Sequence, residues 1–404
     1  MGEILFLAHR IPFPPNRGDK IRSHHLLNAL AQIKPVHVAT FAETAEDRAC
    51  EDQLAEVSAS HCLLGRTKPL ALAGMEAILS KRPVSLAAFD SRKLRDWIAA
   101  TLATRPIDTI VVFSGQMGQF VPHDFRGRVI VDLCDVDSAK FAAYAADGQR
   151  VWINRREAEL LSAEEARLVG LADATILISE QEARLLADRI GVNDQAQIRA
   201  VGNGIDASFF DPGKTQPHPE LSSDAAHFVF TGQMDYPPNV AAVTRFARSI
   251  LPKVGGEIAA QFHIVGRAPS AEVLRLGQLP HVTVWGEVAD VRPFIAVATA
   301  VVAPLTIARG VQNKVLEAMA MARPVVLTPE AATGIGAADG SHFLVRREDE
   351  AFADALAALH NGEVDGAALG QAARTYVLNS MSWDAVYRTL AEIVDTSQSK
   401  SDAA

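Results

Sequence analysis

Short runs of aliphatic and β-branched residues alternate with amphipathic helical patterns along most of the chain. In the first half, such runs predict strands at 4–7, 36–41, 109–113, 129–133, 174–178 and 198–201. Each run is almost wholly apolar, as strands buried on both faces are. Strand–helix alternation is typical of parallel sheets covered by helices. The sequence therefore predicts an α/β protein built from doubly wound, Rossmann-like parallel sheets.

The same pattern starts again in the second half, after a segment at 211–220 that is dense in proline and turn residues. A length of 404 residues favours two domains over one. We expect an N-terminal domain over 1–207, a linker over 208–226 and a C-terminal domain over 227–380. A final helix over 381–404 is expected to pack back on the N-terminal domain and to end in a frayed tail. The two domains are expected to face a cleft, with ligands bound beyond the carboxyl ends of the strands.

Composition and charge exclude several functional classes. The net charge is −9 and no block of lysine and arginine occurs, so nucleic acid is not an expected partner. The three cysteines lack metal-binding spacing and are expected to be free thiols in a reducing cytosol. The start of the chain does not resemble a signal peptide, and the apolar stretch 294–308 is shorter than a membrane helix. We expect a cytoplasmic protein, with peripheral attachment to the inner face of a membrane left open.

The most informative segment follows the strand predicted at 300–304. Arg309 and Gly310 lie in a loop that leads into a helix containing Lys314 and Glu317. The free N–H groups at a helix start favour an anion, and the two cations add full positive charges there. Glu317 is about one turn beyond Lys314 and can accept hydrogen bonds from a pair of sugar hydroxyls. This pattern fits a nucleotide diphosphate. An arginine, a lysine and a glutamate that only cap a surface helix and form salt bridges on it would have the same spacing, and this is the alternative.

That segment resembles the signature of the family-4 retaining glycosyltransferases, which have the two-domain GT-B fold. Glu317, in the context Lys-Val-Leu-Glu-Ala-Met-Ala, matches the second of two family glutamates eight positions apart, the one that binds the donor ribose. Arg309 stands at the position of the first glutamate, which faces the transferred sugar in the family. The resemblance therefore implies a different arrangement for sugar recognition here, with Arg309 in contact with phosphate.

Three other stretches carry the resemblance over nearly the whole chain. Residues 201–206 are similar to the family's Asn-Gly-Ile/Val-Asp segment. Gly232 and Gln233 stand in the loop after the first strand of the nucleotide-binding domain, where the family often has an arginine and a lysine. Arg17 and Gly18 stand in a loop that resembles the one approaching the donor phosphates from the N-terminal domain; the alternative is a proline-stiffened turn. The resemblance implies that Arg309 and Lys314 are catalytic. It implies a donor-binding set of Arg17, Gly18, Gly232, Gln233, Arg309, Gly310, Lys314 and Glu317.

Three aspartates lie at or just after the end of the strand predicted at 129–133, namely Asp132, Asp135 and Asp137. We expect them to orient the acceptor and to cap the next helix, since the family needs no metal. A divalent cation bound by the three carboxylates is the alternative. This segment and the opening loop are most similar to sugar transferases of exopolysaccharide loci associated with PEP-CTERM protein sorting.

The resemblance implies a retaining hexosyltransferase without a cofactor. It would move a sugar from a nucleotide-diphosphate donor to a saccharide or lipid-linked acceptor, in exopolysaccharide biosynthesis. A nucleotide-sugar epimerase of similar architecture is the main alternative. A nicotinamide-dependent dehydrogenase is disfavoured because no GxGxxG follows a strand. A non-catalytic sugar-binding module is disfavoured by the absence of an export signal.

Overall fold

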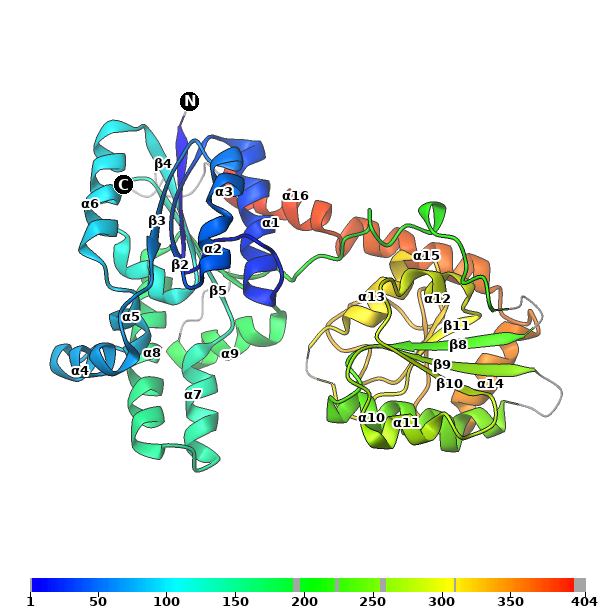
Figure 1. The fold of residues 1–404 in the computed structure, drawn as a ribbon. Helices are drawn as coiled ribbons and strands as arrows, with labels where there is room; N and C mark the ends of the chain where they lie inside the picture. The colour runs from blue at the N-terminus through cyan, green and yellow to red at the C-terminus, as the bar shows by residue number, and fades with distance from the viewer. Residues whose placement is uncertain (1, 192–196, 222–224, 255–258, 309, 396–404) are drawn as a thin grey trace. The chain divides into compact units, whose positions relative to one another are not determined.

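The structure is a computed structural model of the 404-residue chain, and it describes residues 2–191, 197–221, 225–254, 259–308 and 310–395. The chain divides into two compact units (Figure 1). One comprises the residues up to Asn203 together with those from Val386, and the other comprises Gly204–Ala385. The division falls close to residue 207, where a boundary was expected, and residues 208–226, expected to be a linker, are grouped with the second unit.

A seven-stranded parallel sheet forms the centre of the N-terminal unit, in the order β3-β2-β1-β4-β5-β6-β7. Its strands are β1 (Glu3–Ala8), β2 (Val36–Ala42), β3 (Ser60–Gly65), β4 (Ile107–Phe113), β5 (Arg128–Cys134), β6 (Ala174–Leu177) and β7 (Ile198–Ala200). The connecting helices are α1 (Gly18–Ile33), α2 (Ala45–Ala49), α3 (Glu51–Val57), α4 (Leu70–Ser80), α5 (Val84–Phe89), α6 (Arg92–Thr104), η1 (Gly115–Phe120), α7 (Asp137–Ala146), α8 (Val151–Leu171) and α9 (Glu180–Ile190). All six residues of β1 are buried, which explains its unbroken apolar run.

The second unit is built around a six-stranded parallel sheet in the order β10-β9-β8-β11-β12-β13. Its strands are β8 (Ala226–Thr231), β9 (Ala260–Val265), β10 (Val282–Gly286), β11 (Ala300–Ala303), β12 (Val325–Leu327) and β13 (Leu344–Val345). Its helices are η2 (Pro212–Lys214), α10 (Pro237–Arg245), η3 (Phe246–Ile250), η4 (Leu251–Lys253), α11 (Ala271–Leu276), α12 (Arg292–Val297), α13 (Asn313–Ala320), α14 (Asp349–His360) and α15 (Gly366–Ser380). The predicted α/β class with doubly wound parallel sheets is confirmed in both units.

The last helix, α16 (Trp383–Asp395), contains the division between the units. Its later residues belong to the N-terminal unit. There the Arg128 guanidinium donates from Nε to the Ile393 carbonyl at 2.9 Å, and a hydrogen bond of 2.8 Å joins His25 Nδ1 and the Tyr387 hydroxyl. His25 thus has a structural contact with the last helix.

The apolar stretch 294–308 is the end of α12 followed by the buried strand β11. Among the described residues, no helix combines the length and the apolar character needed to cross a bilayer. No helix or strand was predicted from the sequence between residues 42 and 107. This region contains β3, an edge strand whose side chains are mostly half-exposed, so the apolar signal of a central strand is missing. It also contains α4, whose apolar pattern does not face the core.

Candidate functional site

The carboxyl ends of β8 and β11 mark the point in the second sheet where the strand order reverses. The two strands are neighbours, and the chain leaves β8 toward β9 on one side and β11 toward β12 on the other. In open parallel sheets, ligands bind at such a point, beyond the carboxyl ends of the strands. Gly232 and Gln233 follow β8, whereas Gly310, Lys314 and Glu317 follow β11. The sequence-predicted donor residues of this unit therefore flank one switch point.

Two glycines bring the ends of β8 and β9 into close contact. Gly232 has φ +152° and Gly266 has φ +151°, a region that other residues avoid. A Cβ at Gly266 would lie 1.7 Å from the Gly232 carbonyl oxygen. A Cβ at Gly232 would lie 2.9 Å from Asn239 Nδ2 and 3.4 Å from Lys314 Nζ. Because neither Gly232 nor Gly266 carries a side chain, the backbone at the end of β8 can lie close to Lys314.

Lys314 joins the two sides of the switch point. Its ammonium donates to Asn239 Oδ1 at 2.8 Å and lies 4.4 Å from the centroid of the Phe230 ring. Asn239, in the first turn of α10, in turn donates from Nδ2 to the Gln233 carbonyl at 2.9 Å. Lys314 is only 8% exposed. A cation held by an amide and a ring, and not by a carboxylate, keeps its charge available for an anionic ligand. Asn239 was not singled out in the sequence, where it reads as an ordinary residue of a Pro-Pro helix start.

Glu317 lies one turn beyond Lys314 on α13 and is half-buried. Within the described part of the chain, its carboxylate has no hydrogen-bond or ion-pair partner. Burial raises the pKa of Glu317 to about 7, against the opposing influence of Lys314. Burial likewise lowers the pKa of Lys314 to about 8, which the charge of Glu317 opposes. An unpaired carboxylate with a raised pKa is typical of a binding or catalytic group and not of a surface salt bridge.

The remaining predicted donor residues of this unit are more exposed. Gly310 has φ +73° and open space where a Cβ would be. Gln233 donates to Asp235 Oδ1 at 2.6 Å and accepts from Arg267 Nη2 at 3.0 Å. Arg267 follows Gly266 at the end of β9 and adds an exposed cation to the same edge of the sheet. Sequence reasoning missed it, although its position directly after a strand and a glycine was a usable signal. Arg309 lies outside the described residues.

The loop after β1 holds the two donor residues predicted in the N-terminal unit. Arg17 is exposed and its Nε donates to Asp19 Oδ1 at 2.7 Å. Gly18 is the first residue of α1, and nothing lies within 4 Å of the place that a Cβ would occupy there. β1 and β4 are neighbours at the switch point of this sheet. Arg17 and Gly18 therefore lie on the segment that leaves this second switch point.

The three aspartates do not form one group. Asp132 is fully buried and paired with Arg22, whose Nη2 lies 2.8 Å from Asp132 Oδ2. Asp135 and Asp137 instead line a small cavity of about 10 Å³ together with Gln116 and Glu165. No cluster of three or more histidine, cysteine or acidic side chains in the described ranges is placed to hold a metal ion. Asp132 is thus a buried structural partner of Arg22, and of the three predicted acceptor-side residues only Asp135 and Asp137 line this cavity.

A histidine at the same edge escaped the sequence analysis. His9 directly follows β1 and is stacked on Phe113 and edge-on to Phe89. Its Nε2 lies 2.8 Å from Arg10 Nη1 and 3.4 Å from Asp19 Oδ2, and its buried Nδ1 has no partner among the described residues. Burial lowers the pKa of His9. His9 therefore contacts both Arg10 and Asp19, and Asp19 in turn accepts the hydrogen bond from Arg17.

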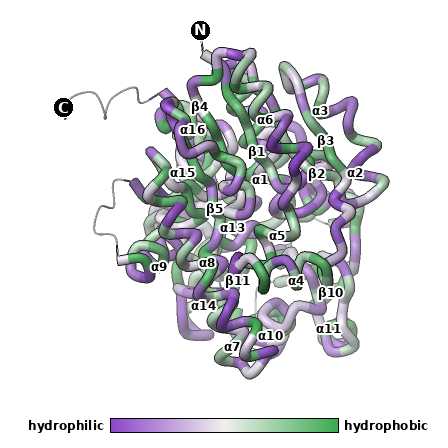
Figure 2. Tube along the Cα trace, turned by 90° about the vertical axis from the view of Figure 1, so that its left-hand side faces the viewer, coloured by the Kyte–Doolittle hydropathy of each residue, from purple (hydrophilic) through white to green (hydrophobic). Residues whose placement is uncertain are grey.

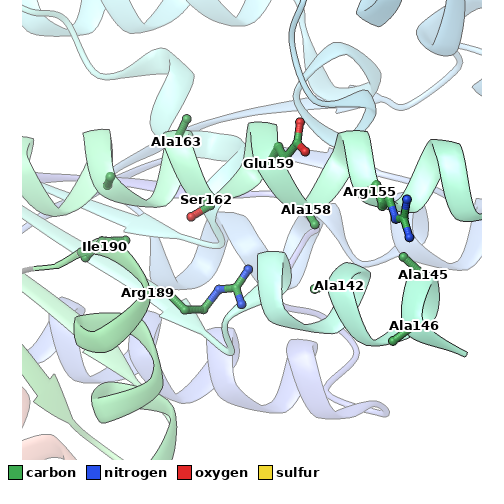
Figure 3. Close-up of a pocket in the computed structure, with 11 residues that line it drawn as sticks. Ala142, Ala145, Ala146, Arg155, Ala158, Glu159, Ser162, Ala163, Arg189 and Ile190 are labelled. Carbon is green, nitrogen blue, oxygen red and sulfur yellow. The ribbon is translucent and has the colours of Figure 1, made fainter.

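A separate groove of about 730 Å³ lies between α7, α8 and the end of α9 (Figure 3). Alanines line most of it, and Arg155, Glu159, Ser162 and Arg189 supply its polar groups. None of the residues predicted from the sequence lies in this groove.

Comparison with known proteins supports the sequence resemblance for the second unit. Residues 225–361 match the family model of glycosyl transferases group 1. No curated protein matches the chain significantly in sequence.

Solved structures share the fold over the whole chain at low sequence identity. HepE of Anabaena in complex with UDP and glucose is 14% identical, with 98% of this chain and 100% of that chain covered and a TM-score of 0.59. A glycosyltransferase of Rickettsia africae is 12% identical, with 97% of both chains covered and a TM-score of 0.62. Sucrose-phosphate synthase of Thermosynechococcus elongatus is 16% identical, with 97% and 98% covered and a TM-score of 0.59. The chain therefore has the GT-B fold predicted above, and its residues 225–361 carry the similarity to group 1 glycosyl transferases.

Proposed function

We propose that the protein is a retaining glycosyltransferase that uses a nucleotide-diphosphate sugar. One observation carries the proposal: the buried cation of Lys314 and the unpaired carboxylate of Glu317 flank the switch point of the domain that matches group 1 glycosyl transferases. In this assignment Lys314 contacts the diphosphate and Glu317 accepts hydrogen bonds from the ribose. Gly232, Gln233 and Gly310 bring the backbone close to the donor.

The chemistry follows from this placement. The bond between the anomeric carbon and the diphosphate oxygen breaks, and negative charge grows on the leaving phosphate. Lys314 stabilises that charge, and we assign the same role to Arg309 from the sequence. The acceptor hydroxyl attacks the same face of the sugar, forms the new glycosidic bond and gives its proton to the departing phosphate. No protein nucleophile, metal ion or cofactor is required by this scheme.

The donor is assigned by similarity and the acceptor by position. Structures of HepE contain UDP or UDP-glucose, so UDP-glucose is the first donor to test. Asp135 and Asp137 are proposed to orient an acceptor hydroxyl, and Arg17 and Gly18 to complete the donor site. A saccharide or lipid-linked acceptor in exopolysaccharide synthesis, at the cytoplasmic side of the membrane, agrees with the resemblance to sugar transferases of such loci.

Replacing Glu317 with alanine is expected to weaken UDP-glucose binding by about 1.5–3 kcal/mol, the range for a hydrogen bond to a charged group. That loss is about 10- to 150-fold in Kd. Isothermal calorimetry measures the loss directly, and hydrolysis and transfer assays report its effect on KM. Thermal unfolding should stay close to that of the parent protein.

A matched control removes a carboxylate from the same unit. Glu363 is exposed and follows α14, so Glu363→Ala should leave the affinity for UDP-glucose unchanged. Equal affinity of Glu317→Ala and the parent would remove Glu317 from the donor site. Interconversion of the sugar of UDP-glucose without any acceptor would replace transfer with epimerisation.

Donor binding is also expected to depend on pH in a bell-shaped way. Glu317 is ionised only above its pKa of about 7, and Lys314 is charged only below its pKa of about 8. Affinity for UDP-glucose should therefore be highest between these values and fall by up to about tenfold per pH unit on either side. Glu317→Gln should remove the decline on the acid side and keep the decline on the alkaline side. A flat profile between pH 5.5 and 9.5, about 1.5 units beyond each pKa, contradicts the assignment of both groups.

A further inference from the structure

Helix α4 packs against the N-terminal unit with its small residues and turns its large apolar residues toward solvent. Ala73 and Ala77 are fully buried, whereas Leu72 is 42% exposed, Met75 58%, Ile78 57% and Leu79 85%. At about 100° per residue, the four large residues form one continuous stripe opposite the two alanines. An ordinary surface helix has the reverse arrangement. Figure 2 shows most of α4 in the colour of hydrophobic residues.

The first turn of α8 extends this stripe. Arg156 donates from Nη2 to the carbonyls of Ala77 and Arg82, at 2.6 and 3.1 Å, so the start of α8 lies against the end of α4. Trp152 and Ile153 precede Arg156 by four and three residues, and they therefore lie on the same side of α8. They are 67% and 44% exposed. We call the combined area the apolar surface; it consists of Leu72, Met75, Ile78, Leu79, Trp152 and Ile153.

Cations surround the apolar surface in a chain whose net charge is −9. Lys81 directly follows α4, and Arg150 and Arg155 lie at the start of α8; all three side chains are exposed. The segments 68–82 and 150–156 together contain six lysines and arginines and a single carboxylate, Glu76. Glu76 is paired with Lys68 at 2.7 Å, and Arg82 and Arg156 are paired with Asp90 and Glu157, which lie just outside these segments. Lys81, Arg150 and Arg155 remain without an ion-pair partner among the described residues. The local charge is thus opposite in sign to that of the whole chain.

The apolar surface lies at a defined edge of the N-terminal sheet. β3 leads into α4, and β5 leads into the α7–α8 pair, so both elements emerge from the carboxyl ends of the strands. Figure 1 shows α4 and the α7–α8 pair extending past this edge of the sheet. Arg17, Asp135 and Asp137 follow strands that end at the same edge.

We infer that the apolar surface docks on the headgroup region of an anionic lipid bilayer. Aliphatic residues with an exposed tryptophan, bordered by lysine and arginine, match the chemistry of that region, where apolar side chains enter and cations meet lipid phosphates. A contact between two copies of this chain is disfavoured, because it would bring the same cations together. The inference does not depend on the proposed sugar transfer. If both hold, a lipid-linked acceptor reaches the edge of the sheet that bears Asp135 and Asp137.

Flotation of the full chain with lipid vesicles tests the inference. The parent protein should float with phosphatidylcholine vesicles that contain phosphatidylglycerol, and should float much less with phosphatidylcholine alone. High salt should weaken the binding, because it screens the cations from the lipid phosphates. The double substitution Met75→Glu and Leu79→Glu should lower the partition coefficient by at least about tenfold. Both side chains are already exposed, so the variant should fold and still bind UDP-glucose like the parent.

Two controls distinguish binding through the apolar surface from nonspecific adsorption of the protein to vesicles. Leu274 on α11 is 55% exposed in the other unit, and Leu274→Glu should not change vesicle binding. The fluorescence of the parent should shift to shorter wavelength on binding, and Trp152→Phe should remove most of that shift while the other tryptophans stay. Failure of the parent to float, or equal flotation of the double variant, overturns the inference. A dimer of the parent in light scattering that the double variant abolishes assigns the surface to a second copy instead.

Discussion

Replacement of Asp132 with alanine is expected to lower the free energy of unfolding of the N-terminal unit by about 3–5 kcal/mol, the range for breaking a buried ion pair. Arg22 and Asp132 are each 1% exposed. Arg22 donates from Nε to Asp132 Oδ2 at 2.9 Å, and also to Asn203 Oδ1 and the Val201 carbonyl, each at 2.9 Å. Without the carboxylate, a buried guanidinium keeps its other hydrogen bonds and loses its counter-charge. Thermal unfolding should show a drop of roughly 6–20 °C for a unit of this size.

Asp135→Ala is the matched control, because Asp135 lies three residues further on and is exposed. It should leave the melting temperature within about 2 °C of the parent, as surface substitutions do. If Asp135 orients the acceptor, its effect should instead appear in the acceptor KM. Equal melting temperatures for Asp132→Ala and the parent would show that the Arg22–Asp132 pair does not hold the unit together.

Gly266→Ala is expected to have an effect of similar size in the other unit. The new Cβ would lie 1.7 Å from the Gly232 carbonyl oxygen, at a φ of +151° that alanine avoids. Backbone strain of about 1–3 kcal/mol and overpacking of about 1–3 kcal/mol together give a loss of about 2–6 kcal/mol. The ends of β8 and β9 must separate, which moves Gly232 away from Lys314. UDP-glucose binding should therefore weaken along with stability, and denaturant unfolding and calorimetry measure the two effects.

Gly286→Ala distinguishes strain from overlap. Gly286 ends β10 with φ +71°, and nothing lies within 4 Å of a Cβ at that position. Only the left-handed backbone penalty applies, so we expect a loss of about 1–2 kcal/mol and an unchanged affinity for UDP-glucose. If both alanine variants lose the same stability, the close approach of β8 and β9 is not what Gly266 permits.

The sequence was most informative where the residues concerned lie only a few positions apart along the chain. Lys314 and Glu317 are three residues apart on one helix, so their joint position could be predicted from spacing alone. The apolar strands of both sheets were found because burial on two faces leaves an unbroken apolar run. β3 was missed because an edge strand is half-exposed and lacks that run.

The sequence by itself determined two doubly wound parallel sheets and the loop-to-helix segment that bears Lys314 and Glu317, since both follow from local periodicity and short spacing. Only the tertiary structure decided which partner each charged group has. Lys314 meets Asn239 across 75 positions, and Asp132 meets Arg22 across 110. It also decided that α4 turns its leucines outward, because periodicity indicates that a helix has two faces but not which face the domain covers.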